Sequence, residues 1–206
     1  FILVHPDALD DIGGTSYWNM GGWAISVHDD LKFIENLINL LMDKYSVNSE
    51  RIYSTGMSNG GFFSFHLACN LNASFAAVAS VTGSMSYDTF NNCNARNPTP
   101  VLQIHGSIDT VVPYNGIESI MKPVSDVMEY WKLNNGCDDF ILSIPGITPG
   151  TTSWTETYLF ENCLNETQNI HLYVQGAGHI WPGSIYARIN SPNSSQTIWD
   201  FFSKYD

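Results

Sequence analysis

A serine that could act as a nucleophile lies in the G-x-S-x-G pentapeptide at residues 56–60. The segment over residues 51–56 is typical of a strand, and residues 59–71 are typical of a helix. A sharp turn between a strand and a helix presents a serine hydroxyl for attack on a carbonyl carbon, and it requires small neighbours such as glycine. In that setting the backbone N–H of Asn59 would point at the negative charge that develops on the carbonyl oxygen. The pattern therefore predicts Ser58 as the nucleophile of an acyl-transfer reaction.

A serine hydroxyl needs a general base, and the histidines downstream of the expected helix are the candidates. His179 lies in the segment QGAGHIWPG, just beyond an expected strand over residues 169–175. A loop beyond the carboxyl end of a strand is where open α/β sheets hold their sites. His105 ends another expected strand, and His171 lies inside one, as a structural histidine would. His179 is the predicted base, with His105 as the alternative.

The base in turn needs a carboxylate that fixes its tautomer and stabilises the imidazolium. Asp109 follows an expected strand over residues 98–106 by a few positions, and the apolar residues 111–113 would bury one side of its loop. Asp138 and Asp139 follow the end of an expected helix, where they would be solvated. Asp109 is the predicted acid. The resulting chain order of nucleophile, acid and base is that of enzymes with a strand–turn–serine motif.

The elements that must position these residues alternate along the chain. Apolar residues at helical spacing predict a helix over residues 27–45 and another over residues 124–136, ended by Gly136. Ser194 or Ser195 is expected to cap a last helix. Further strands are expected over residues 1–4, 75–83, 139–144 and 152–160, with the last two as candidate neighbours. This alternation predicts an α/β fold in one domain over residues 1–206, a mostly parallel sheet with helices on both faces.

The charge balance argues against nucleic acid as a partner. The chain has 8 Lys and Arg against 20 Asp and Glu, a formal net charge of −12, and phosphate binding needs clustered cations. No H-E-x-x-H or similar ligand spacing occurs, so neither a metal nor another cofactor is expected. No apolar run has the length that a membrane span needs.

The four cysteines are expected to form two disulfides. Cys69–Cys93 and Cys137–Cys163 are favoured because each pair brackets one local unit, and four reduced thiols are the alternative. No C-x-x-C pair is present, which argues against a zinc ribbon or a thioredoxin-like site. Disulfides form in oxidising compartments, so we expect a secreted or periplasmic protein.

Aromatic residues near these loops are candidates for substrate binding. Trp181 lies two positions from the predicted base, and Tyr17, Trp18 and Trp23 lie in a glycine-rich loop. Their rings could stack on a feruloyl group, a sugar or an apolar polyester chain. The alternative is that they pack the loops against the domain.

Three segments, YSTGMSNGG, PVLQIHGSIDTVVPY and GAGHIWPG, resemble in order and spacing the polyhydroxybutyrate-depolymerase-like esterases. That family has the α/β-hydrolase fold and includes feruloyl and acetylxylan esterases, and the resemblance covers nearly the whole chain. It implies Ser58, Asp109 and His179 as the catalytic triad. Family members also carry an earlier strand, ending in His-Gly, whose loop supplies a second oxyanion donor. Nothing precedes Phe1, so the resemblance implies a domain that lacks its N-terminal strands.

Taken together, the sequence predicts a serine hydrolase that cleaves carboxylic esters through an acyl-enzyme. The expected substrates are a polyester, a feruloylated or acetylated polysaccharide, or a small ester. A serine peptidase of the same fold would use the same triad, although no specificity domain such as a propeller is evident. A degenerate hydrolase that only binds a polymer is the alternative outside enzymes, and the intact triad argues against it.

Overall fold

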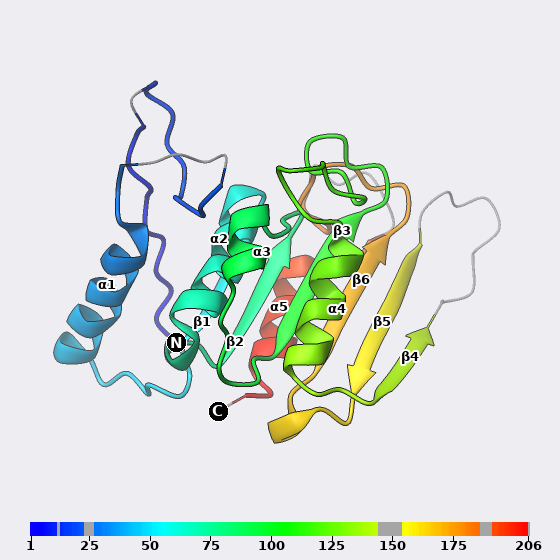
Figure 1. The fold of residues 1–206 in the computed structure, drawn as a ribbon. Helices are drawn as coiled ribbons and strands as arrows, with labels where there is room; N and C mark the ends of the chain where they lie inside the picture. The colour runs from blue at the N-terminus through cyan, green and yellow to red at the C-terminus, as the bar shows by residue number, and fades with distance from the viewer. Residues whose placement is uncertain (12, 23–26, 144–153, 186–190, 206) are drawn as a thin grey trace.

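A six-stranded sheet forms the centre of the molecule (Figure 1). The structure, a computed structural model, describes residues 1–11, 13–22, 27–143, 154–185 and 191–205. The strands lie in the order β1-β2-β3-β6-β5-β4. Their bounds are β1 Tyr53–Met57, β2 Ala77–Val81, β3 Val101–Gly106, β4 Asp139–Ser143, β5 Thr155–Glu161 and β6 Asn169–Val174. The first four strands of this order run parallel, so their carboxyl ends share one edge, at the top of Figure 1. β5 runs antiparallel to β6, and β4 antiparallel to β5.

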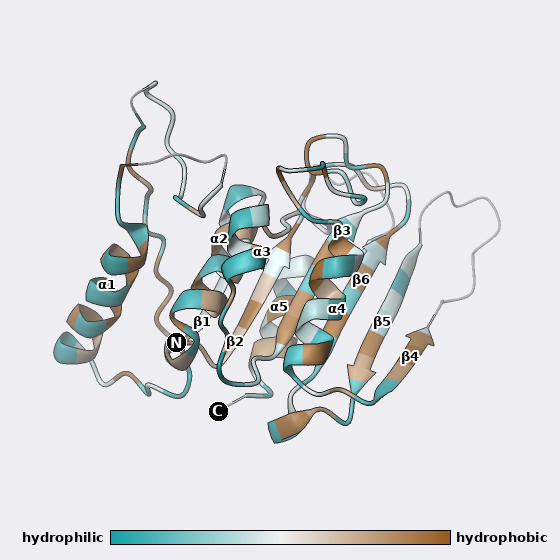
Figure 2. Ribbon diagram, viewed as in Figure 1, coloured by the Kyte–Doolittle hydropathy of each residue, from teal (hydrophilic) through white to brown (hydrophobic). Residues whose placement is uncertain are grey.

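Helices cover both faces of the parallel strands. The bounds of the helices are α1 Asp30–Lys44, α2 Asn59–Asn70, α3 Tyr87–Asn92, α4 Val124–Asn134 and α5 Ser194–Phe202, with short 3₁₀ turns at Asn72–Ser74 and Leu164–Glu166. Helices α2 and α4 lie on one face, α5 lies on the other, and α1 lies beside β1 (Figure 1). Every residue of β2 and β3 is buried, which explains why β2 reads as an apolar run rather than as an alternating pattern (Figure 2). The predicted fold class is confirmed.

The ends of the helices follow local capping chemistry. The Asp29 carboxylate accepts from the backbone N–H of Lys32 at 2.9 Å and caps α1. Gly136 follows α4 with a φ of 59°, a left-handed conformation that suits glycine. The predicted cap of α5 is wrong by a residue or two, because the Asn193 side chain accepts from the N–H of Gln196. Ser194 is instead the buried first residue of that helix.

The expected strand over residues 1–4 is wrong. These residues form no strand, and Phe1 is 93% exposed with its ring 4.8 Å from the ring of Trp199. An apolar run becomes a strand only where it pairs with a neighbour, and residues 1–4 leave the outer edge of β1 unpaired among the described strands. Helix α3 had no expectation, because its sequence YDTFNN is short and polar.

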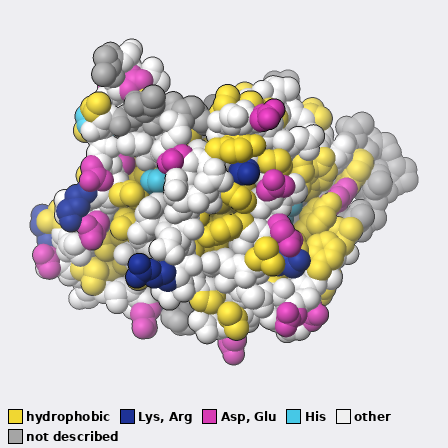
Figure 3. Space-filling model, in the orientation of Figure 1, with side chains coloured by type: hydrophobic (Ala, Val, Ile, Leu, Met, Phe, Trp, Pro, Cys, Tyr) yellow, Lys and Arg dark blue, Asp and Glu magenta, His cyan; other side chains and the backbone are white. Residues whose placement is uncertain are grey.

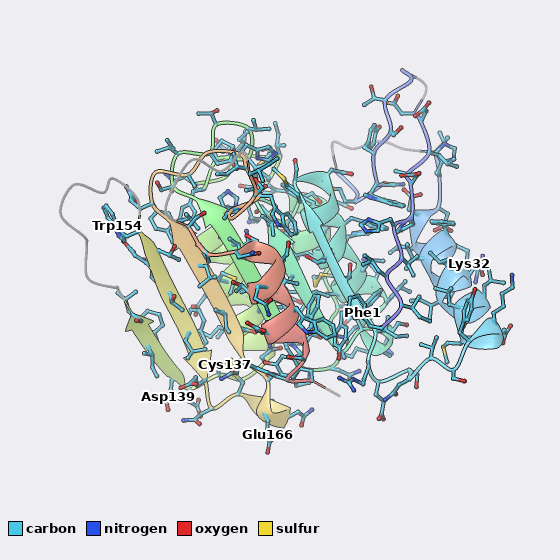
Figure 4. All side chains as sticks on the ribbon, turned by 180° about the vertical axis from the view of Figure 1, so that it is seen from behind. Phe1, Lys32, Cys137, Asp139, Trp154 and Glu166 are labelled. Carbon is cyan, nitrogen blue, oxygen red and sulfur yellow. A yellow bond between two sulfur atoms is a disulfide. The ribbon has the colours of Figure 1, made fainter. Side chains whose placement is uncertain are left out.

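Both favoured disulfides are present. Cys69–Cys93 joins the last turn of α2 to the end of α3. Cys137–Cys163 joins the segment after α4 to the segment after β5, so it closes the base of the β4–β5 hairpin. Cys137 lies near the end of the sheet opposite the parallel carboxyl edge (Figure 4). Within the described part of the chain, no helix has both the length and the apolar character that crossing a bilayer requires.

Candidate active site

Ser58 stands at a strained turn between β1 and α2. Its φ is 54° and its ψ is −122°, a conformation that costs a non-glycine residue about 1–3 kcal/mol. The Ser58 N–H donates to the carbonyl of Val81 at 2.9 Å, which fixes the turn to the end of β2. A Cβ on Gly56 would lie 2.5 Å from the carbonyl carbon of Gly60, so the turn closes only with glycine at position 56. The chain thus forms the sharp strand–helix turn that the G-x-S-x-G pattern predicts.

Asp109 and His179 form a buried carboxylate–imidazole pair. His179 Nδ1 lies 2.8 Å from Asp109 Oδ2, and the Asp109 side chain is 0% exposed against 19% for His179. The other carboxylate oxygen, Oδ1, accepts from the backbone N–H groups of Val111 and Val112, both at 2.9 Å. Oδ1 therefore closes the loop that carries Asp109, and Oδ2 accepts the Nδ1 proton of the imidazole. In a neutral ring this arrangement places the proton on Nδ1 and leaves Nε2 of His179 unprotonated.

The loops that carry this pair are bonded to each other. Ile108 N–H donates to the Ala177 carbonyl at 3.0 Å, and Gly176 N–H donates to Ser107 Oγ at 2.8 Å. A Cβ on Gly106 would lie 2.3 Å from the Ala177 carbonyl oxygen, so the two loops touch where β3 ends. This contact between the loops holds Asp109 and His179 in fixed positions relative to each other.

Ser58 lies at the same edge of the sheet as Asp109 and His179. Met57 pairs with Val81 on β2, which pairs with Ile104 on β3. One strand therefore separates the serine's strand from the acid's strand, a distance of about 10 Å at ordinary strand spacing. The loop that carries His179 follows β6, the next strand along. The three predicted residues thus come from the carboxyl ends of β1, β3 and β6.

The alternative bases lie deeper in the protein. His105 is fully buried, and its Nε2 lies 2.8 Å from the Val112 carbonyl. Burial lowers the pKa of the His105 imidazole below its usual range. Burial also lowers the pKa of His171 to about 3. Neither side chain reaches the surface, which fits a structural position better than proton transfer with a substrate.

The alternative acids are solvated, as expected. Asp138 and Asp139 are both exposed, and Asp139 accepts a hydrogen bond from the side chain of Asn162. They lie at the start of β4, which is the strand farthest from β1 in the sheet. Their position separates them from the serine.

The Asn59 side chain has a role that sequence reasoning missed. Its Oδ1 accepts from the backbone N–H of Trp18 at 2.7 Å, and its Nδ2 donates to the Trp18 carbonyl at 3.1 Å. The Trp18 ring stacks on Phe63 of α2 with centroids 4.9 Å apart. The Asn59 side chain therefore joins the glycine-rich loop to the first turn of α2, next to Ser58. The sequence shows only an asparagine beside the serine. An asparagine side chain can form many kinds of hydrogen bond, so its partner could not be predicted.

The other aromatic candidates have packing partners of their own. Tyr17 forms a hydrogen bond with Asp11, and Trp181 Nε1 donates to Ser195 Oγ at 3.1 Å. Trp181 is partly buried against the core beneath α5. Trp23 lies outside the described residues. Trp18 is therefore the aromatic candidate that the structure connects directly to the serine turn.

Charged side chains on the face shown in Figure 3 are mostly acidic. Lys and Arg side chains are few and scattered among the acids on the face shown in Figure 3. Groups of three or more His, Cys, Asp or Glu side chains that could hold a metal ion do not occur among the described residues. The donor groups at the sheet edge instead suit an acyl-transfer reaction.

A parallel sheet between two helical layers, with a serine at a strand–helix turn and an Asp–His pair on later loops, defines the α/β-hydrolase fold. The chain belongs to the phospholipase/carboxylesterase family, whose sequence profile matches residues 24–135. The matched residues include Ser58 and Asp109. His179 lies beyond them.

The named relatives include fungal esterases. A bifunctional acetylxylan esterase/xylanase of Neocallimastix patriciarum is 27% identical over 100% of this chain and 26% of its own length. Feruloyl esterase B of Piromyces equi is 28% identical over 91% of this chain and 33% of its own length. Feruloyl esterase D of Neurospora crassa is 25% identical over 100% of this chain and 62% of its own length. The chain thus spans less than two thirds of each of these relatives.

Solved structures share the fold at low sequence identity. The acetyl xylan esterase from Aspergillus awamori superimposes with a TM-score of 0.59 at 18% identity, over 91% of this chain and 73% of its own. Esterase PE8 gives a TM-score of 0.52 at 16% identity, over 84% of this chain and 59% of its own. These likenesses support the fold assignment.

Proposed function

We propose that the protein is a serine esterase that hydrolyses carboxylic esters through an acyl-enzyme. The observation that carries this proposal is the 2.8 Å contact between His179 Nδ1 and Asp109 Oδ2, at the sheet edge where the strained Ser58 turn also lies. The esterase names of the relatives support the same reaction class.

In the proposed mechanism, neutral His179 takes the proton of the Ser58 hydroxyl as its oxygen attacks the ester carbonyl. The Asp109 carboxylate stabilises the imidazolium that forms and holds Nδ1 protonated. The Asn59 backbone N–H, at the start of α2, donates to the oxyanion. The imidazolium then gives its proton to the leaving alcohol, and water activated by the same base releases the acid.

The substrate we propose is an acetylated or feruloylated polysaccharide. Two relatives carry feruloyl esterase names and one carries an acetylxylan esterase name. The Trp18 ring is connected to the serine turn through Asn59 and is stacked on Phe33 and Phe63, so it would offer the acyl group an edge of the ring. The two disulfides suit an oxidising compartment, so we propose a secreted or periplasmic location.

A fluorophosphonate probe followed by peptide mapping tests the nucleophile, with Ser58→Ala as the matched control. We expect labelling of Ser58 alone and ester turnover that falls at least about 10³-fold in the variant. Methyl ferulate, acetylated xylan and a short peptide substrate, supplied in parallel, separate the acyl classes. Label at another residue would refute the nucleophile, and turnover of the peptide alone would favour the peptidase alternative. Absence of label and of turnover in the folded protein would favour a polymer-binding role.

A further inference from the structure

A second histidine lies beside the proposed acid and has no part in the mechanism above. His105 is the penultimate residue of β3 and its side chain is 0% exposed. Its Nε2 lies 2.8 Å from the Val112 carbonyl oxygen and 3.7 Å from Asp109 Oδ2. The groups that face its ring are the Asp109 carboxylate, the His179 and His171 imidazoles and the edge-on ring of Tyr114.

The neighbours of His105 assign its tautomer. The Gln103 amide nitrogen lies 2.9 Å from the Gly83 carbonyl and 3.0 Å from His105 Nδ1. An amide nitrogen donates and does not accept, so Nδ1 is the acceptor and the proton is on Nε2. That proton points at the Val112 carbonyl. A second proton on Nδ1 would face the amide hydrogens of Gln103, so the network holds the ring neutral.

The loop that carries Asp109 is therefore held at Val112 by two hydrogen bonds, one to its N–H and one to its carbonyl. The Val112 N–H donates to Asp109 Oδ1, and the Val112 carbonyl accepts from His105 Nε2. If the Asp109 carboxylate alone closed this turn, the turn and the carboxylate could rotate together. The contact with His105 ties the turn to β3, whose residues are all buried. The remaining oxygen, Oδ2, is thereby aimed at His179.

We propose that His105, oriented by Gln103, is a positioning residue that holds the loop of Asp109 so that its carboxylate engages His179. This inference rests on the proposed function for its catalytic consequence. Its structural part, the Asp109–His179 hydrogen bond, can be observed without any substrate. The two can therefore fail separately.

The test compares two substitutions at position 105. His105→Gln places an amide donor near the position of Nε2, whereas His105→Phe keeps the ring volume and removes the donor. Proton NMR of ¹⁵N-histidine-labelled protein reports the Nδ1–H of His179, assigned by its loss in His179→Gln. In His105→Phe we expect this resonance to vanish and kcat for a small aryl ester to fall roughly 100-fold with KM unchanged. His105→Gln should keep the resonance and a rate within about tenfold of the original.

His171→Phe is the matched control, because it replaces another buried imidazole on the neighbouring strand with the same ring. It should leave both the resonance and the rate unchanged. If His105→Phe fails to fold by circular dichroism, Gln103→Met decides, since it removes the amide that orients His105 and should weaken the resonance. Retention of the His179 resonance in a folded His105→Phe or in Gln103→Met would overturn the inference. If the His179 resonance is present in a folded protein that shows no ester turnover, the proposed function alone would be refuted.

Discussion

The two halves of the sheet are built in different ways. In the parallel half, β2 and β3 are wholly buried between helices, and their carboxyl ends carry loops joined by hydrogen bonds. In the antiparallel half, every residue of β4 is exposed and every residue of β5 is partly exposed. The candidate triad draws on the parallel half alone. Burial on both faces fixes strand positions, and catalytic geometry depends on such fixed positions.

The β4–β5 hairpin relies on a different restraint. Its exposed apolar residues Phe140, Ile141 and Leu142 contribute little burial. The Cys137–Cys163 disulfide instead closes the hairpin at its base, over a separation of 26 residues. One half of the sheet is thus stabilised by its core and the other by a covalent link.

Matched leucines give the largest expected contrast between the halves. Leu102 in β3 is fully buried, whereas Leu142 in β4 is 44% exposed. Leu102→Ala should lower the free energy of unfolding by about 4 kcal/mol, because it leaves a cavity in the core. Leu142→Ala should lower it by less than about 0.5 kcal/mol. Urea unfolding measures both values, and equal losses would show that the two halves are not distinct.

Removal of one disulfide should loosen one half selectively. In Cys137→Ala/Cys163→Ala, we expect a loss of about 3 kcal/mol in the free energy of unfolding, from the entropy that the unfolded chain regains. Amide hydrogen exchange should accelerate in β4 and β5 while β2 and β3 stay protected.

Cys69→Ala/Cys93→Ala is the control for this experiment, because it opens a loop of similar length, with a separation of 24 residues, in the other half. It should leave exchange in the hairpin unchanged. Uniform loss of protection in the first variant would contradict a local role for the disulfide.

The parallel half should also be the acid-sensitive half. Burial lowers the pKa of His171 to about 3 in the folded protein, against about 6.5 for an unfolded histidine. A depressed pKa of this kind favours folding above about pH 6.5, and the contribution is lost as pH falls toward 3. Between pH 7.5 and pH 5, the original protein should lose about 2 kcal/mol more stability than His171→Phe. Urea unfolding at the two pH values checks this, and equal slopes would mean that His171 protonates without cost.

Sequence patterns predicted the strands of both halves, and the segments expected over residues 139–144 and 152–160 are β4 and β5, paired as neighbours. Apolar runs and G-x-S-x-G located β1, β2, β3 and the Ser58 turn, because burial and glycine geometry leave direct marks on residue type. The run at residues 1–4 misled, since periodicity does not reveal whether a partner strand exists. Helix α3 was not predicted because its six residues are mostly polar and too few to form an apolar stripe.

The Asp–His pair of the candidate site was predictable from the sequence, and the contacts that support the site were not. Chain order and loop position pointed to Asp109 and His179, whose pairing is seen at 2.8 Å. The bonds from Asn59 to Trp18 and from His105 to Val112 join side chains to backbone atoms. Backbone partners are the same at every position, so a sequence carries no trace of which one is used.

The close approach of α2 to β2 limits how the site could be redesigned. A Cβ on Gly61 or on Gly83 would lie 2.6 Å from Ser80 Oγ, so α2 packs on β2 with no room for a side chain at either glycine. A combinatorial library that varies these positions would consist mostly of unfolded members. Under the proposed esterase activity, variation in the accepted acyl group would come from the loops above the sheet, where insertions can accumulate without disturbing the Ser58 turn.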